Sequence, residues 1–382
     1  MQDDVAYIEA QSQGLQVQAA NQKLLQAEIE SLLQIISISP DQLQCLKEAS
    51  PGSMKGLEQI ENALVLLYKA IVTIDPSLRL TNVRSRDDTT SIRSAGGFGD
   101  NEIGSMQVVK EKRNTYKEES LFFLRRLRNH FEIQFSVAFA STKDAMLQDG
   151  ALKRSGHLKG KIDTRHHDLA WKALWRYAPI LLFAREVGHK EWERILEKYE
   201  EASKSVTQEE FSNAINAWRK TYRKPASEDT DFIFVNEREE KKEQGMAGGL
   251  GRKLTVKAPQ LNRLRSMADM GSKDKDRGKD AGIRTSEVFA TALEETSAVI
   301  FMEQNFIIDL FHINSIESGD FPDAVYASPP NLRQGSDLRK SRPLDPSREM
   351  LQQTARSMET IYDFWPSQMQ NLILWTIEFD PT

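Results

Sequence analysis

The first forty residues carry a seven-residue apolar repeat, which limits what this chain can fold into more than any other feature. One stripe of the expected helix holds two interleaved lines of apolar residues, Ile8, Leu15, Ile29 and Ile36 on one and Leu25 and Leu32 on the other. Gln22 stands where the register wants a further apolar residue. One helix cannot bury such a stripe alone, and a stripe interrupted by glutamine makes a poor homodimer. The pattern predicts one helix of a mixed bundle, which indicates assembly rather than catalysis.

Composition sets wide bounds on the fold and excludes several classes of protein. The 382 residues suffice for about two to three compact domains or for one rod of packed helices. A net charge of −5 gives no overall attraction to nucleic acid or to anionic lipid. Cys45 is the only cysteine, which excludes an intrachain disulfide and a cysteine-cluster metal site and fits the reducing cytoplasm. We expect neither a signal peptide nor a membrane span, because no apolar run approaches the roughly 20 residues that a span needs.

Apolar spacing predicts helices along most of the remaining sequence. The first helix should run from about residue 3 to 37 and stop before Pro40. Further helices are expected over residues 57–75, 108–147, 168–187, 192–224, 288–313 and 347–379. Pro179 should kink the helix that contains it. The fold class is therefore predicted as all-α, an N-terminal coiled-coil helix followed by an elongated rod of stacked helical bundles.

Polar and Gly-rich stretches divide this helical chain into expected domains. Residues 1–75 form the assembly segment, which consists of the coiled-coil helix and an adjoining helix, and residues 76–107 form a linker. The rod covers residues 108–320, with flexible loops near 237–257 and 271–282. A second linker covers residues 321–346, and residues 347–382 begin a further bundle. Because the sequence ends soon after that helix, we expect a fragment with neighbouring parts missing.

Nucleotide-binding motifs fail on spacing. In the stretch GMAGGLGRK over residues 245–253 the outer glycines are six residues apart, and Arg252 stands where a phosphate loop needs Lys before Ser or Thr. Gly96, Gly97 and Gly99 do not match a dinucleotide fingerprint. We interpret both stretches as loops and expect no cofactor.

Two adjacent histidines, His166 and His167, lie beside Asp163 and Asp168 and form the best candidate for chemistry. Adjacent residues of a helix diverge by about 100°, so the pair cannot share one metal ion from one face. Asp163 and His167 have the correct spacing but supply only two ligands. We predict a solvated helix N-terminus, capped by Asp163 or Thr164, with no metal. A hydrolase that uses His166, His167 and Asp168 is the weaker alternative.

Basic residues gather in two places. Arg125, Arg126 and Arg128 are expected on a solvated face opposite a buried apolar stripe. The second cluster lies in an expected loop and comprises Lys153, Arg154, Lys159, Lys161 and Arg165. These side chains could meet anionic lipid headgroups, so a membrane-surface module is an alternative function.

Two segments carry a resemblance to a known family: YKEESLFFLRRLRNHFEIQF from Tyr116 and RHHDLAWKALWRYAPILLFAREVGHKEWERILEKYEEA from Arg165. They resemble the C-terminal helical region of the exocyst complex component 1 family, in a fungal form, and residues 282–313 resemble its next helical stretch. The resemblance implies a non-enzymatic subunit that tethers secretory vesicles and is recruited to the periphery of the plasma membrane.

In that family the coiled coil near the start bundles with helices of three other exocyst subunits. The resemblance therefore assigns partner contact to the seam, defined here as Ile8, Leu15, Gln22, Leu25, Ile29, Leu32 and Ile36. The family's PH-like module, which binds phosphoinositides and Rho-family GTPases, has no counterpart in this sequence. Those two activities are accordingly not expected of this chain, and neither is nucleic-acid binding.

Overall fold

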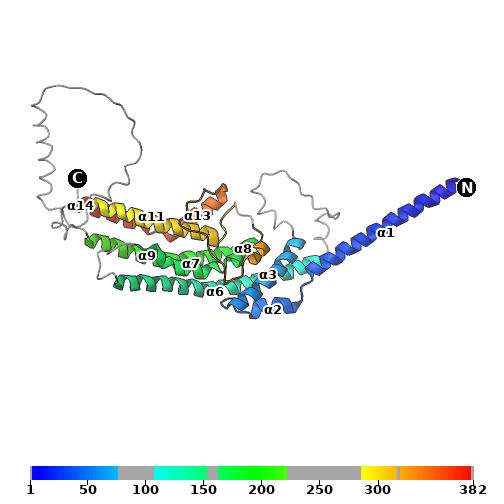
Figure 1. Cartoon of the computed structure of the whole chain (residues 1–382), viewed down its shortest axis with the longest axis horizontal. Helices are drawn as coiled ribbons and strands as arrows, with labels where there is room; N and C mark the ends of the chain where they lie inside the picture. The colour runs from blue at the N-terminus through cyan, green and yellow to red at the C-terminus, as the bar shows by residue number, and fades with distance from the viewer. Residues whose placement is uncertain (1, 76–106, 153–161, 222–284, 316–318, 380–382) are drawn as a thin grey trace, which may run out of the picture. The chain divides into compact units, whose positions relative to one another are not determined.

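The computed structural model describes residues 2–75, 107–152, 162–221, 285–315 and 319–379 (Figure 1). Every regular element within these ranges is a helix, which confirms the all-α class. The elements are α1 (Gln2–Ile36), α2 (Pro40–Glu48), α3 (Met54–Ile74), α6 (Gln107–Leu152), the 3-10 helix η2 (Thr164–His167), α7 (Asp168–Trp175), α8 (Ala178–Val187), α9 (His189–Thr221), α11 (Thr285–Leu310), α12 (Phe321–Ala327), α13 (Arg348–Ile361) and α14 (Trp365–Phe379).

The chain divides into two compact units. The first comprises Met1–Arg154, Asp163–Glu210 and Ser297–Trp365, and the second comprises Ser155–Ile162, Phe211–Thr296 and Pro366–Thr382. Aromatic side chains fill the core of the first unit, among them Tyr116, Phe123, Phe131, Phe135, Tyr177, Phe183, Tyr199, Phe306 and Phe311. In the second unit, the guanidinium of Arg219 lies 5.6 Å from the ring centroid of Trp375, and Leu372 is fully buried.

Helix α3 is central to the first unit, and its local sequence explains where it begins. The Ser53 side chain caps the helix by accepting a hydrogen bond from the Gly56 amide at 3.1 Å. A Cβ at Gly56 would lie 2.3 Å from the Ser50 carbonyl oxygen, so only glycine fits this turn. The apolar residues predicted on one face, Leu57, Ile60, Leu64, Leu67 and Ile71, are all fully buried, which confirms that stripe.

Two expected helices are each divided in the structure. Instead of a kink at Pro179, α7 ends at Trp175 and α8 begins at Ala178. The expected helix over residues 347–379 separates into α13 and α14, with Pro366 just inside α14. Both divisions have the same cause. Proline lacks an amide hydrogen and suits the first turn of a helix, so the chain starts a new helix there.

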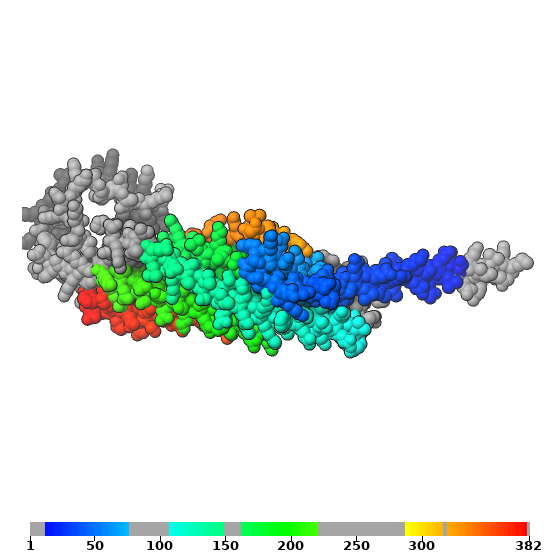
Figure 2. Space-filling model, turned by 90° about the horizontal axis from the view of Figure 1, so that it is seen from below, coloured from blue at the N-terminus to red at the C-terminus, as the bar shows by residue number. Residues whose placement is uncertain are grey.

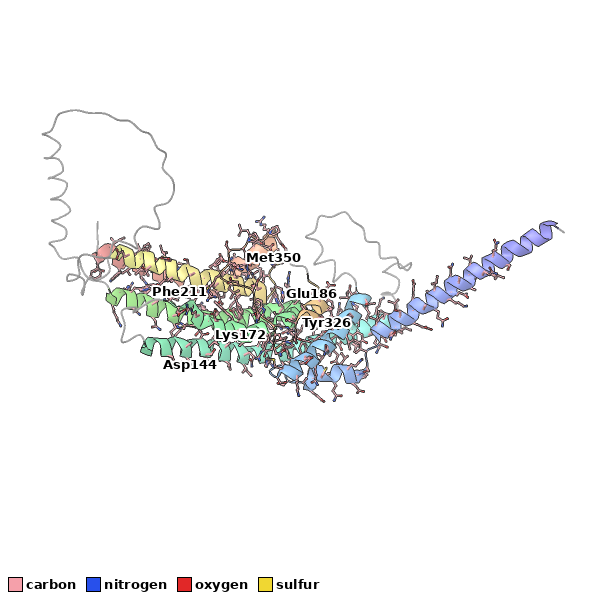
Figure 3. The ribbon with its side chains drawn as sticks, in the orientation of Figure 1. Asp144, Lys172, Glu186, Phe211, Tyr326 and Met350 are labelled. Carbon is pink, nitrogen blue, oxygen red and sulfur yellow. The ribbon has the colours of Figure 1, made fainter. Side chains whose placement is uncertain are left out.

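Residues 321–346, expected to be a linker, are packed into the first unit. The ring of Phe321 on α12 lies 5.5 Å from that of Tyr68 and 5.3 Å from that of Phe183, measured between centroids. Tyr326, on the same short helix, is exposed to solvent, and the Lys69 ammonium lies 5.9 Å from the centroid of its ring (Figure 3). The packing depends on partners far away in sequence, which local composition does not reveal.

An ion pair buried in the first unit joins this segment to α3. The guanidinium of Arg333 donates to both carboxylate oxygens of Glu61, at 2.6 and 2.8 Å, and also to the carbonyl of Arg176 at 2.7 Å. Both charged side chains are at most 4% exposed. A buried pair of this kind stays charged only because each partner satisfies the other.

Candidate partner-helix site on the first helix

Helix α1 is a single uninterrupted helix of 35 residues, close to the bounds expected from the sequence (Figure 1). Its many Gln, Ala, Leu and Glu residues lose little conformational freedom in a helix. The Gln26 side chain donates to the Glu30 carboxylate at 2.9 Å, one turn further along. Ser39 and Pro40 then start α2 with a capping box that includes Gln42.

The C-terminal end of α1 is held by the rest of the first unit. The hydroxyl of Tyr116, a buried residue of α6, donates to the Ile36 carbonyl. The same hydroxyl accepts a hydrogen bond from the Ile38 amide at 3.2 Å. Ile36 is 7% exposed, and the last turns of α1 pack against α3. One end of the predicted seam is therefore buried within this chain.

The rest of the described seam is open. Leu15 is 61% exposed and Ile29 is 45% exposed, and Gln22 is exposed between them. Leu25 and Leu32 are half-buried. The side chain of Ile8 lies outside the described residues. Large apolar side chains exposed at helical spacing are typical of a surface that binds another protein.

Helix α1 carries a second set of exposed apolar residues that the sequence analysis missed. Val17, Leu24, Leu33 and Ile35 are between 42% and 65% exposed. Leu33 borders the seam, whereas Val17, Leu24 and Ile35 lie roughly 100° away from it around the axis. The seven-residue step from Val17 to Leu24 was the available signal. Apolar residues on two sides suit a helix inside a bundle of several helices better than one helix of a two-helix coiled coil.

The structure corrects the interpretation of His167. Asp163 does cap the 3-10 helix, accepting from the Arg165 amide at 3.0 Å. His167, however, is only 1% exposed, and its Nε2 lies 3.0 Å from the Glu210 carboxylate. Burial lowers the pKa of this imidazole, but the neighbouring Glu210 carboxylate raises it by more than burial lowers it. The net pKa therefore lies above the ordinary value. A ring buried this deeply cannot meet a substrate.

The other members of the histidine cluster do not assemble a reactive site. The Asp168 carboxylate lies 3.4 Å from the Arg339 guanidinium at the surface, and His166 is half-buried. Among the described residues, no group of three or more His, Cys, Asp or Glu side chains is placed to hold a metal ion. The geometry offers nothing in favour of the hydrolase alternative.

Two of the three arginines expected on a solvated face instead connect helices of the first unit. Arg126 donates to the carbonyls of Leu46, at 2.7 Å, and of Ala49. Arg128 forms an ion pair with Glu191 at 2.9 Å, whereas Arg125 is exposed as expected. These bonds attach α6 to α2 and α9.

Most of the second basic cluster falls outside the described residues. Lys153, Arg154, Lys159 and Lys161 belong to that undescribed stretch. The Arg165 side chain is 82% exposed, with its Nε 3.9 Å from the Asp163 carboxylate. Contact with lipid headgroups therefore stays a prediction.

The glycine-rich stretches at residues 96–99 and 245–253 also lie outside the described residues. None of the described helices is long and apolar enough to cross a bilayer.

Comparison with known proteins places both ends of the chain in one family. Residues 1–73 match the family model for the exocyst complex component Sec3, coiled-coil, and residues 310–382 match the one for the exocyst complex component Sec3, C-terminal. No curated protein and no solved structure matches. The segments after Tyr116 and Arg165 that carry the sequence resemblance lie between the two matched regions. The Glu61–Arg333 ion pair joins one matched region to the other.

Proposed function

The chain belongs to the exocyst complex component Sec3 family, and from this premise we propose that it is a non-enzymatic subunit for tethering secretory vesicles to the plasma membrane. It acts in the cytoplasm, at sites of exocytosis, as part of a complex with other exocyst subunits. Its contribution is structural: it presents a helix to those subunits and connects that helix to a folded body.

The single observation that carries this proposal is the open apolar surface of α1. Leu15, at 61% exposed, and Ile29, at 45%, have seam spacing but no cover from the chain itself. Burial of one such side chain by a partner would contribute on the order of 1.5–3 kcal/mol to the free energy of binding. Helices of other exocyst subunits are the proposed cover, and the second apolar line through Val17 and Leu24 suits contact with more than one of them.

The packed end of α1 suits a role in which force passes along the helix into the first unit. Tyr116 bonds the carbonyl of Ile36 and the amide of Ile38, so the helix is bonded to α6 where it enters the first unit. A tether must pass tension from its binding surface to the rest of the subunit. Anchoring one end while the other stays open supports that requirement.

The test places charge on the open part of the seam. In the double variant Leu15→Asp with Ile29→Asp, two carboxylates would have to enter the partner interface without counter-charges, which costs several kcal/mol. We expect co-expressed exocyst subunits to be lost from affinity purification of this chain. Circular dichroism should show unchanged helix content, because both side chains are exposed here.

A matched control carries the same two charges on the same helix. Gln16→Asp with Gln34→Asp places them on exposed positions about 160° from the seam centre. This control should retain the partner subunits. Equal recovery of partners by wild type, control and seam variant would overturn the proposal.

A further inference from the structure

Helix α6 and the part of α9 up to Glu210 lie alongside each other in the first unit, and Figure 2 shows the two helices in cyan and green. Tyr199 of α9 packs between two aromatic rings of α6, with centroids 5.3 Å from Phe135 and 5.5 Å from Phe139. Further along, Lys143 pairs with Glu209 at 2.8 Å. The outer side of this contact is a groove of about 390 Å³.

Small side chains form the middle of the walls of this groove, and charged side chains complete its lining. Ser136 and Ala140 form its α6 wall, and Ala202 and Ser205 form its α9 wall. Its lining also includes the buried side chains of Phe139 and Val206, which are 3% and 2% exposed. A depression with small walls and apolar side chains beneath them admits the large side chains of an approaching helix.

The α6 edge of the groove carries an apolar stripe that nothing in the described chain covers. Ile133, Val137 and Leu147 are 63%, 59% and 71% exposed. Together with Ala140 and Asp144 they follow the alternating steps of four and three residues that define a coiled-coil seam. Helix α6 is therefore apolar on two faces, since its opposite face fills the core.

The charges that line the groove balance each other, whereas the stripe beside it carries one carboxylate. Glu132 and Glu201 stand against Lys143 and Lys198 in the lining. Both lysines are already engaged, Lys143 with Glu209 and Lys198 with Glu201 at 3.0 Å. Asp144 lies within the stripe itself, exposed near the C-terminal end of α6 (Figure 3). A basic residue of an occupant would therefore find its partner at Asp144.

We propose that the α6–α9 groove binds an amphipathic helix of another exocyst subunit, with large apolar residues at heptad spacing and a Lys or Arg placed opposite Asp144. The proposal rests on the proposed function and adds a second partner surface, separate from α1. Asp144 within the stripe argues against two other occupants. An anionic membrane would repel this carboxylate, and the same stripe of a second copy would bring a second aspartate. A polar residue within the stripe would also fix the register of the bound helix.

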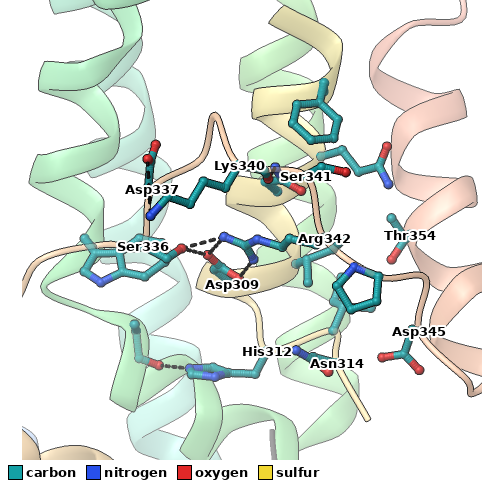
Figure 4. Close-up of a pocket in the computed structure, with 18 of the residues that line it drawn as sticks. Asp309, His312, Asn314, Ser336, Asp337, Lys340, Ser341, Arg342, Asp345 and Thr354 are labelled. Carbon is teal, nitrogen blue, oxygen red and sulfur yellow. Dashed lines mark hydrogen bonds and ion pairs between the residues drawn. The ribbon is translucent and has the colours of Figure 1, made fainter. Parts of the chain in front are cut away.

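Other surfaces of the first unit point less clearly to an occupant. A larger cavity there, of about 810 Å³, lies between α8, α11, α13 and the segment after α12 (Figure 4). Its charged groups are largely satisfied within the chain: Arg342 donates to both oxygens of Asp309, and Asp345 accepts from the Ser315 amide at 2.7 Å. Nothing there selects a partner, whereas the α6–α9 groove combines spacing, shape and charge.

The first experiment is site-specific photo-crosslinking in the exocyst complex purified from co-expressed subunits. Benzoylphenylalanine replaces Val137 at the groove edge and, as the control, Leu169 of α7, which is 64% exposed. We expect Val137 alone to form an adduct with a partner subunit, mapped by mass spectrometry to a helical segment with heptad apolar residues and a basic residue. An adduct within this chain or with a second copy of it, or no adduct at all, would overturn the proposal.

Substitutions then test shape and charge separately. Ala140→Trp fills the groove and Asp144→Lys reverses the charge within the stripe. Each should weaken binding of the crosslinked subunit roughly tenfold, as expected for loss of an anchor. Changing the mapped basic residue of the partner to Glu should restore binding to the Asp144→Lys variant. Unaltered binding of the crosslinked subunit by both variants, with unchanged thermal midpoints of unfolding, would refute the proposal that the groove binds a partner helix.

These experiments separate this inference from the proposed function. If the α1 seam variant loses all partners but the groove variants lose none, the subunit role holds and the groove proposal fails. If the seam variant still assembles and only the groove variants lose the crosslinked subunit, the groove stands and the role assigned to α1 fails.

Discussion

Helices α1 and α3 have the same kind of apolar spacing and lie in the same matched family region, yet their side chains have opposite fates. On α3, Leu57 and Leu64 are fully buried; on α1, Leu15 is 61% exposed and Ile29 is 45% exposed. Apolar spacing shows that a helix needs neighbours. It does not show whether the same chain supplies them, and this difference distinguishes a core helix from an assembly helix.

Neighbouring elements account for the difference. Helix α3 packs against α1, α2, α6, α8 and α12, so every part of its wide apolar face is covered. Within the described residues α1 packs principally against α3, at the end that Tyr116 also holds. The open residues of α1 therefore contribute little to the stability of this chain, and we propose that they serve binding instead.

The largest expected effect comes from placing a charge in α3. Leu64→Asp buries a carboxylate at a fully enclosed position, and we expect a loss of more than about 4 kcal/mol in the free energy of unfolding. Urea denaturation followed by circular dichroism measures the change. Gln59→Asp, at an exposed position of the same helix, is the control. A stable Leu64→Asp protein would show that α3 is not a core helix.

A slightly smaller effect is expected where α3 meets the segment after α12. Arg333→Ala removes the partner of the buried Glu61 carboxylate, at an expected cost of about 3–5 kcal/mol. The double variant Glu61→Leu with Arg333→Met removes both charges and should recover most of that loss. If the double variant were as unstable as Arg333→Ala, the cost would come from lost packing rather than from an unpaired charge.

A pH effect is expected at the end of α11, where His312 adopts a positive φ of 55°. Its Nε2 donates to the Ala178 carbonyl at 2.8 Å, and burial lowers its pKa to about 4. As the pH falls, the histidine of the unfolded chain, with a pKa near 6.5, binds a proton before the buried histidine of the folded chain does. The neutral form of His312 therefore contributes its full share to the free energy of unfolding above about pH 6.5. That contribution falls by about 3 kcal/mol as the pH drops to 4.

Comparison with His312→Asn isolates this contribution, because asparagine tolerates a positive φ but does not titrate. The difference in unfolding free energy between the two proteins should shrink as the pH falls from 7 to 4. Glu200, whose pKa burial raises to about 6, titrates in both proteins and cancels in the comparison. A pH-independent difference would contradict the assignment.

The smallest effect on stability is expected at the open seam. Leu15→Asp with Ile29→Asp should change the free energy of unfolding of the isolated chain by no more than about 0.5 kcal/mol, as for other exposed positions. The same variant is expected to lose its partners, so stability and assembly separate on α1. A drop comparable to that of Leu64→Asp would remove the distinction between the two helices.

Local patterns predicted the parts of the fold that depend on neighbours in sequence. The bounds of α1, the buried stripe of α3 and the Asp163 cap follow from periodicity and capping chemistry. The predictions failed where one partner is distant. Glu210, which pairs with His167, lies 43 positions away, and Glu61 and Arg333 are 272 positions apart. No local pattern marks such pairs, because only the folded chain brings them together.

For the candidate site, the sequence by itself determined that α1 forms a long helix with an apolar seam, because helix propensity and seven-residue spacing are properties of neighbouring residues. Only the tertiary structure decided which part of that seam is open. It buries Ile36, leaves Leu15 exposed, and adds Val17 and Leu24 to the apolar surface. Exposure depends on which elements pack nearby, and packing is a property of the whole chain rather than of any one segment.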